Sequence, residues 1–171
     1  MRRLILFRHA KSCWADPDLA DHDRPLTQRG QLAAPLMGAW LAWRGYLPDA
    51  VLCSSSARTI ETWRAAQPML PQSPPPQILR DLYHADPETL LRLLRAAPDS
   101  AGTVAIVGHQ PGIGAFARKL ASIDTPPGCA RAFQKFPTAA CAVMDFDVDR
   151  WSDVAFGAAR FHAFAIPREL V

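Results

Sequence analysis

Short apolar runs alternate along this chain with segments whose apolar residues recur at helical spacing. A continuous apolar run is typical of a strand that is buried on both faces of a parallel sheet. Near the end of the chain, two β-rich segments flank a turn at residues 149–153, which predicts a hairpin or edge strands. Strands are expected at residues 4–7, 50–53, 78–79, 103–107, 140–148 and 158–166.

Capping residues and helical periodicity predict helices between these strands. Thr27 can cap the first helix, which is expected to end at Gly45. The serines at 54–56 supply capping hydroxyls for the second helix, and the proline-rich stretch 71–76 cannot continue it. That stretch is expected to be an exposed, extended connector, and residues 10–25 a long loop. Helices are expected at residues 28–43, 57–69, 88–97 and 113–121.

Two of these helices carry apolar residues that are spaced to share one face. We expect both faces to be core, with a partner surface as the alternative for the face that bears Trp40 and Trp43. The residues are Leu32, Leu36, Ala39, Trp40 and Trp43 on the first helix, and Leu90, Leu91 and Leu94 on the third.

Alternating strands and helices of these lengths predict an α/β fold. We expect a three-layer α/β/α sandwich around a mostly parallel sheet with an antiparallel edge strand, forming a single domain over residues 1–171. In such sheets, ligands bind in the crevice at the carboxyl ends of the strands. Residues that follow the predicted strands are therefore the first candidates for chemistry.

Composition and charge exclude several classes of function. The chain has 171 residues, 49% of them hydrophobic and 20% charged, which is ordinary for a globular protein. A formal charge of +3, with basic residues scattered among acidic ones, argues against a nucleic-acid partner and favours a small anionic group bound in a local pocket.

The cysteines and the apolar runs bear on the compartment. Cys13, Cys53, Cys129 and Cys141 show no metal-type spacing, so we interpret them as free thiols. The apolar run that starts the chain is interrupted at Arg8, too soon for a signal peptide. No run approaches the roughly 18 apolar residues of a membrane-spanning helix. A cytoplasmic protein without a membrane partner is expected.

Candidate chemistry follows three of the predicted strands. Arg8 and His9 follow the first, Arg58 comes shortly after the second, and His109 follows the strand at 103–107. A phosphoryl group in transfer carries negative charge on its oxygens and needs fixed cations and an in-line nucleophile. Arginine suits the role of fixed cation because its planar guanidinium stays charged and donates paired hydrogen bonds. Histidine suits the role of nucleophile because its neutral ring can accept a phosphoryl group.

These residues lie in motifs that resemble a known family. Residues 7–10 (FRHA), 55–62 (SSARTIET) and 107–109 (VGH) resemble, in order, three blocks of the histidine phosphatase (phosphoglycerate mutase-like) superfamily. Residues 8–14 (RHAKSCW) and 23–30 (DRPLTQRG) are similar to its SixA-type phosphohistidine phosphatase branch. Ala10, where glycine is commoner, fits that branch.

The resemblance implies residue roles and a reaction. It implies that His9 is the phosphorylated nucleophile, that Arg8 and Arg58 bind phosphoryl oxygens, and that His109 stabilises their charge. Arg24 is expected to line the same pocket. Inorganic phosphate is the product, and neither a metal nor another cofactor is expected.

The substrate is inferred from what the chain lacks. Larger members of the superfamily carry a helical insertion before the third block that covers the substrate and supplies a glutamate as proton donor, and here that segment is short. A phosphohistidine is easier to cleave without a strong acid, since imidazole leaves with a conjugate-acid pKa of about 6.5. The expected substrate is a phosphorylated protein, such as a histidine-phosphotransfer domain. Asp81 is the first candidate for any acid, with His84 or water as alternatives.

Other kinds of site fit the sequence less well. A cysteine-dependent phosphatase has five residues between its cysteine and arginine, whereas Cys53 and Arg58 are separated by four. His109 has no partner at His-x-x-x-His or Cys-x-x-Cys spacing for zinc. His22, His84 and His162 are interpreted as surface or structural residues, and Glu61 as pairing along its helix. A phosphatase of small phosphate esters and a non-catalytic module that binds phosphorylated proteins remain as alternatives.

Overall fold

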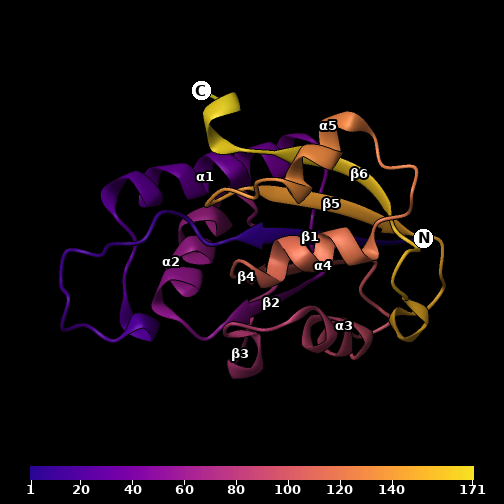
Figure 1. Ribbon diagram of the computed structural model, residues 1–171, viewed down its shortest axis with the longest axis horizontal. Helices are drawn as coiled ribbons and strands as arrows, with labels where there is room; N and C mark the ends of the chain where they lie inside the picture. Colours follow the sequence, from indigo (N-terminus) through magenta and orange to yellow (C-terminus); the bar gives the residue numbers. More distant parts are fainter.

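The computed structural model describes residues 1–171 and is built on one six-stranded sheet (Figure 1). The order of the strands across the sheet is β3-β2-β4-β1-β5-β6. The strands that sequence patterns predicted are all present, with ends shifted by one or two residues. They are β1 (Arg2–Arg8), β2 (Ala50–Ser54), β3 (Gln77–Leu79), β4 (Thr103–Gly108), β5 (Cys141–Phe146) and β6 (Arg160–Ala165).

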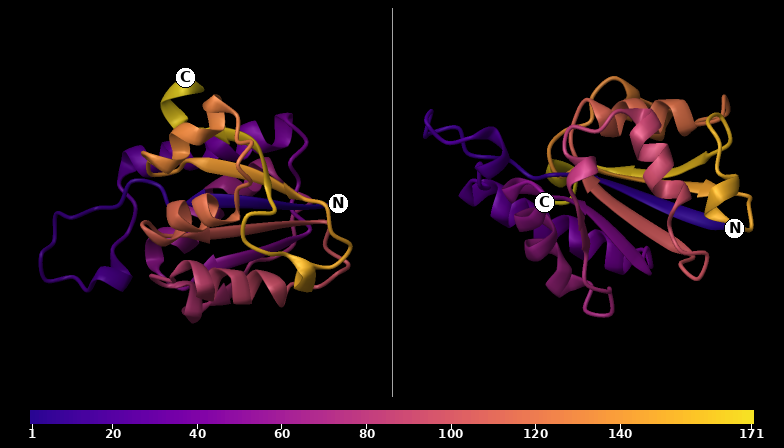
Figure 2. Two further views of the ribbon diagram at one scale, coloured as in Figure 1. Left: turned by 45° about the vertical axis from the view of Figure 1, so that its right-hand side comes forward. Right: turned by 90° about the horizontal axis from the view of Figure 1, so that it is seen from below.

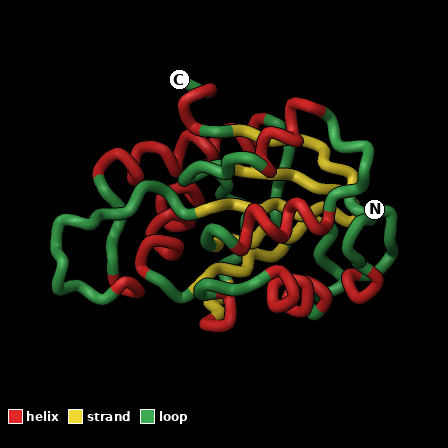
Figure 3. The backbone as a smooth tube through the Cα atoms, viewed as in Figure 1, coloured by secondary structure: helices red, strands yellow, loops and turns green.

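Most of the sheet is parallel. β3, β2, β4 and β1 all run in the same direction, whereas β5 pairs antiparallel with both β1 and β6. The antiparallel strand therefore lies one position inside the edge, which β6 forms. Figure 3 shows the strands as one continuous layer with helices and loops around it.

Helices cover both faces of the sheet (Figure 2). α1 and α2 pack on one face, and α3 and α4 on the other. A short helix, α5, precedes the loop that leads into β5. None of the helices combines the length and the apolar character that a membrane span requires. The helices are α1 (Gln28–Trp43), α2 (Ala57–Ala66), α3 (Pro87–Arg95), α4 (Gly112–Leu120) and α5 (Pro127–Ala130).

The continuous apolar run of β1 is buried on both faces of the sheet, as expected for a central strand. Successive side chains of a strand point to opposite faces. Leu4 and Leu6 belong to the core shared with α3 and α4, and Ile5 and Phe7 to the core shared with α1 and α2. All four are fully buried. Burying both faces of one short strand fixes where its polar end, Arg8, must emerge.

The prediction for the buried face of α1 was right for Trp40, which is buried, and wrong for Leu32 and Trp43. Trp43 is 82% exposed and Leu32 is 68% exposed. The helix instead buries its other side, where Gly38 lies against the backbone of Ala66 at the end of α2: a Cβ atom at Gly38 would stand 2.6 Å from that carbonyl oxygen. Because α1 is apolar around much of its circumference, this close approach decides which face turns inward. The buried residues are Gly30, Ala34, Met37, Gly38, Trp40 and Leu41.

The second helix is shorter than expected. α2 ends at Ala66, and Gln67–Met69 continue as a turn of 3-10 helix. Pro68 accounts for the change, because a proline in a helix removes a hydrogen-bond donor and clashes with the preceding turn.

The α1–α2 contact predicts a stability defect for Gly38→Ala. Alanine normally stabilises a helix interior by about 0.5–1 kcal/mol relative to glycine. Here the added methyl group meets the carbonyl of Ala66, so we expect a loss of about 1–3 kcal/mol in the free energy of unfolding. Gly128→Ala is the control, because nothing lies within 4 Å of its Cβ position. Urea unfolding of both variants checks the prediction, and equal stability would contradict it.

Candidate active site

Three separate segments of the chain meet at one edge of the sheet. In the parallel β1–β4 pair, Arg8 stands opposite Gly108, so that His9 and His109 both leave the sheet at the same level. Their ring centroids are 5.4 Å apart. β2 ends beside them at Ser54, and α2 begins three residues later. His9, Arg58 and His109 are all more than nine-tenths buried.

Arg58 is placed by the start of α2. The Ser56 side chain caps this helix by accepting a hydrogen bond from the Thr59 N–H, which satisfies one of the free donors of the first turn. The Arg58 guanidinium then reaches across to Asp21, donating to its carbonyl oxygen at 2.7 Å and to Oδ2 at 3.0 Å. The Arg58 fork is thus held in one orientation before any ligand binds.

The hydrogen bonds of His9 determine which of its nitrogens is free. Nδ1 lies 2.8 Å from the Ala10 carbonyl oxygen. A carbonyl can only accept, so the proton resides on Nδ1 and the Nε2 lone pair is available. The backbone around it is fixed as well: the Ala10 N–H donates to the Thr62 hydroxyl at 2.9 Å, and the Ala139 N–H donates to the His9 carbonyl at 2.9 Å.

His109 shows the complementary arrangement. Its Nε2 is 2.8 Å from the Ser54 hydroxyl, whereas its Nδ1 is buried and has no hydrogen-bond partner. If the hydroxyl donates, Nδ1 carries the proton and points it at no group of the protein. A buried donor without a partner is costly, and an anion oxygen in the pocket would satisfy it.

Both histidines are held in the neutral form. Burial, together with the charges of Arg8 and Arg58, lowers the pKa of His9 to about 4. Burial, with the charges of Arg58 and His9, lowers the pKa of His109 to about 3. At neutral pH the site therefore holds two uncharged imidazoles, His9 near Arg8 and Arg58, and His109 near Arg58. This arrangement combines a nucleophile, a neutral donor and fixed positive charge, which is what phosphoryl transfer requires.

Arg8 supplies the second positive charge. Its Nη1 donates to the Phe136 carbonyl at 2.9 Å, and its buried Nε has no partner. Burial, and then repulsion from Arg58, lowers the pKa of Arg8. The positive charges of the two guanidiniums repel each other. An anion bound near both would reduce this repulsion and be attracted by both charges.

Asp21 is the one carboxylate at this site. It accepts hydrogen bonds from the Tyr83 hydroxyl and from Arg58, and His84 Nε2 is 3.5 Å from its Oδ2. Burial acts to raise the pKa of Asp21, but the hydrogen bonds from Tyr83 and Arg58 outweigh it and the pKa is lowered. The carboxylate therefore stays ionised and offsets part of the charge of the two arginines.

Of the six residues predicted for the site, the structure brings four together: Arg8, His9, Arg58 and His109. Arg24 lies at the margin of this cluster. Its guanidinium stands 4.0 Å from the ring centroid of Trp14, and its Nε is 3.8 Å from Asp21 Oδ1. Asp81 is directed elsewhere, since its exposed carboxylate pairs with Arg92 at 3.4 Å.

Comparison with known protein families identifies the family of this chain. Residues 4–86 match the model of the histidine phosphatase superfamily (branch 1). An uncharacterised protein of Mycobacterium tuberculosis is 39% identical over 165 residues, which cover 94% of this chain and 99% of that protein. The chain belongs to the histidine phosphatase superfamily, because the family match is joined by a 34% identical solved structure of a SixA protein that covers 97% of the chain.

Solved structures agree with this membership. A protein from Nakamurella multipartitia assigned as the phosphohistidine phosphatase SixA is 34% identical, with a TM-score of 0.82 and coverage of 97% of this chain and 96% of that one. The protein histidine phosphatase SixA complexed with tungstate shares the fold at 23% identity, with a TM-score of 0.81 and coverage of 99% of both chains. Membership in the histidine phosphatase superfamily and likeness to SixA structures indicate a phosphatase.

Sequence reasoning missed several neighbours of this histidine phosphatase site. Asp21 was one of many acidic residues in a long loop, and no pattern marked it as the partner of Arg58. The sequence left His84 open, as a surface or structural histidine or as an alternative to Asp81 for the acid, and no pattern placed its Nε2 3.3 Å from Arg58 Nη2. Its position directly after Tyr83, in the segment where the family places a proton donor, was the available signal. Glu61 accepts from the Leu26 N–H at 3.3 Å rather than pairing along its own helix.

The cysteine interpretation is confirmed. All four cysteines are free thiols. Cys53 is fully buried, and burial raises the pKa of its thiol to about 12, which leaves no reactive thiolate at neutral pH.

The lowered histidine pKa values predict how stability depends on pH. In the unfolded chain, histidine takes up a proton near pH 6.5, whereas folded His9 does so only near pH 4. The stability that neutral His9 contributes is therefore complete above pH 6.5 and is lost as the pH falls from 6.5 toward 4. Between pH 7 and 4.5, we expect the wild type to lose about 2 kcal/mol more unfolding free energy than His9→Gln. Parallel curves from urea titrations would contradict this.

The Ser54–His109 contact predicts that Ser54 positions the imidazole. Ser54→Ala leaves Nε2 with only the long 3.5 Å contact to the Ser56 hydroxyl, so both tautomers of His109 become accessible. We expect orthovanadate to bind several-fold more weakly, with a loss of about 1–2 kcal/mol in unfolding free energy. The His109 ring nitrogen shifts in NMR spectra should change as well, which a loss of stability alone would not cause. Ser55→Ala, whose hydroxyl contacts His22 instead, is the control.

Proposed function

We propose that this protein is a phosphatase that works through a phosphohistidine intermediate on His9 and removes phosphate from phosphohistidine on a protein. The observation that carries the proposal is the neutral His9 ring, with its Nδ1 proton held by the Ala10 carbonyl and its Nε2 free, beside Arg8, Arg58 and His109. No other group at the site combines nucleophilicity at neutral pH with this environment.

The reaction then takes place in two displacements. The Nε2 lone pair of His9 attacks phosphorus, an Nε2–P bond forms, and the P–N bond to the substrate imidazole breaks. The departing nitrogen takes up a proton. Water next attacks the phosphorus, the Nε2–P bond breaks, and phosphate leaves with His9 again neutral. Arg8 and Arg58 hold the phosphoryl oxygens in both steps, and the Nδ1–H of His109 donates to one of them. Arg24 lines the approach to the pocket.

The leaving group favours phosphohistidine as the substrate. Expelling an alkoxide at neutral pH needs a well-placed acid, whereas imidazole leaves readily. Asp81, the first candidate for that acid, pairs with Arg92. His84 stands beside Arg58 instead and is half-exposed, so we propose that it donates the proton, with Asp21 holding its ring in place.

The open surroundings favour a protein as the carrier of that phosphohistidine. The segment between α2 and β4 contains only short elements, and its helix α3 packs against α4 on one face of the sheet rather than above the strand ends (Figure 1). A site that no helix covers can admit a side chain that is attached to a folded domain, such as a histidine-phosphotransfer domain. The likeness to SixA structures adds support.

One observation favours a second candidate, a phosphatase of small phosphate esters. His84 is 54% exposed and adjoins Arg58, so its ring stands where the proton that an ester oxygen needs on leaving would have to be delivered. The two candidates share the His9 intermediate and differ in the substrate that is cleaved fastest.

The nucleophile is tested by substitution and trapping. His9→Ala should lower kcat by roughly a thousandfold or more, because no other group replaces Nε2. Wild-type protein quenched during turnover with labelled substrate should carry phosphate that is labile in acid and stable in base, and His9→Ala should carry none. His162→Ala, on β6, is the matched control and should behave as wild type.

The same assay separates the substrates. We expect a higher kcat/KM for a phosphohistidine peptide than for phosphoserine or sugar phosphates, with inhibition by vanadate. Acid-stable label on the enzyme would exclude His9 as the nucleophile. Cleavage of esters alone would establish the second candidate instead, and binding without turnover would leave the non-catalytic module.

A further inference from the structure

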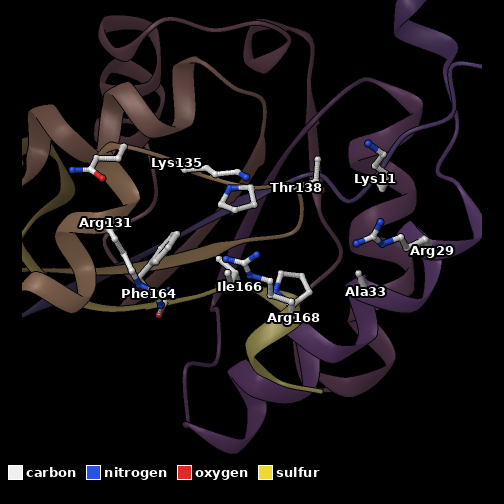
Figure 4. A pocket seen from close by; sticks show the side chains of 12 residues that line it. Lys11, Arg29, Ala33, Arg131, Lys135, Thr138, Phe164, Ile166 and Arg168 are labelled. Atoms are coloured by element: carbon white, nitrogen blue, oxygen red, sulfur yellow. Dashed lines mark hydrogen bonds between the residues drawn. The ribbon is translucent and has the colours of Figure 1, made fainter.

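A cationic groove lies beside the candidate active site. It has a volume of about 420 Å³ and lies between the first turns of α1, the loop before β5, and the end of β6. In Figure 4, Lys11 and Arg29 on one wall face Lys135 and Arg168 on the other. We call these residues the groove cations: Lys11, Arg29, Lys135 and Arg168.

The groove cations form no ion pairs within the protein, although Arg168 is near enough to Glu169 to help Arg131 lower the pKa of that carboxyl. All of them are exposed, and none forms an ion pair with a carboxylate. A further cation in the lining, Arg131, is paired with Glu169 at 2.7 Å. No aspartate or glutamate lines the groove. The net charge of the whole chain is only +3, so this one place concentrates more uncompensated positive charge than the average surface can.

The groove and the catalytic pocket share a wall. Lys11 follows His9 by two residues, and the loop that carries Lys135 also holds Arg8 through the Phe136 carbonyl at 2.9 Å. Four residues beyond Lys135, the Ala139 N–H donates to the His9 carbonyl at 2.9 Å. The groove therefore continues the same sheet edge from the end of β1 toward the end of β6, where Arg168 stands.

We propose that the groove cations bind aspartate and glutamate side chains on the surface of the phosphorylated protein substrate while its phosphohistidine occupies the catalytic pocket. This inference rests on the proposed function. The substrate must be large enough to extend past the 134–139 loop, which a protein surface does and a small ester does not. The cations come from separate segments and are free of hydrogen bonds, so they suit several carboxylates spread over a surface. The partly buried Phe164 is the one aromatic ring in the lining and leaves no platform for stacking nucleic-acid bases.

The test uses paired substrates and paired variants. One phosphohistidine peptide carries a flanking run of glutamates, and the other carries glutamines at the same positions. The enzyme variants are Lys135→Glu/Arg168→Glu and, with the same change in net charge, Arg64→Glu/Arg150→Glu. Arg64 is exposed on α2. Arg150 is exposed in the β5–β6 connection, which lies at the end of the sheet where β1 begins, opposite to the candidate active site.

We expect the wild type to show a KM about tenfold lower for the glutamate peptide, with equal kcat for both peptides, because exposed ion pairs each change affinity by only a few-fold. Added salt should remove this preference. Lys135→Glu/Arg168→Glu should lose the preference with its kcat and its KM for the glutamine peptide unchanged. Arg64→Glu/Arg150→Glu should keep it.

Several outcomes would overturn the proposal. Equal KM values for the two peptides in the wild type would do so, and so would an equal loss on both peptides in the groove variant. Tighter competition by single-stranded DNA of the same charge than by the unphosphorylated glutamate peptide would assign the groove to nucleic acid instead. If no phosphohistidine peptide is cleaved, the proposed function fails alone. The difference in Kd between the unphosphorylated glutamate and glutamine peptides, measured on the same variants, then still decides the role of the groove.

Discussion

The candidate site depends on one electrostatic constraint: two guanidiniums must be held near each other in a largely buried pocket. Buried charge is costly, and like charges increase the cost. The sheet imposes the arrangement, because β1 and the β2–α2 turn deliver Arg8 and Arg58 to the same edge and a packed core fixes both elements. Asp21 relieves part of the repulsion through its contact with Arg58, whereas the Nε of Arg8 is left without a partner.

The same constraint explains why both histidines of the site are unprotonated on one nitrogen and therefore neutral. A protonated imidazole between two guanidiniums would add a third positive charge in a buried place, so His9 and His109 stay neutral. For His9 this is the reactive form. For His109 it means that a single proton must be placed on the correct nitrogen, which gives the hydroxyl of Ser54 its importance. Hydrogen bonds to Ala10 and Ser54 therefore matter as much to the chemistry as the rings themselves.

Much of this site could be predicted from the sequence because strand ends are easy to locate. Leu4 to Phe7 is buried on both faces, so Arg8 and His9 had to emerge at the sheet edge, and the same reasoning placed His109. The partners of Arg58 could not be predicted, since Asp21 and His84 come from loops whose paths depend on tertiary contacts. The buried face of α1 could not be predicted from the spacing of its apolar residues either, because the helix is apolar on several sides. The contact of Gly38 with Ala66 decides which side is buried. Asp81 was predicted as the acid because it lies in the segment where the family has a glutamate. Its ion pair with Arg92 could not be predicted from the spacing of the residues.

The openness of the strand ends connects the chemistry to recognition. With α3 packed on the face of the sheet, the groups that lie over Arg58 come from loops, Asp21 from the loop after β1 and His84 from the turn before α3, and no helix encloses a substrate there. Recognition must then come from the surface around the pocket, where exposed charges act through long-range attraction rather than burial. A site that relies on an easily expelled imidazole can tolerate such an arrangement, because it does not need the water-excluding closure that a poor leaving group requires. In this protein, leaving group, open pocket and charged rim favour the same class of substrate.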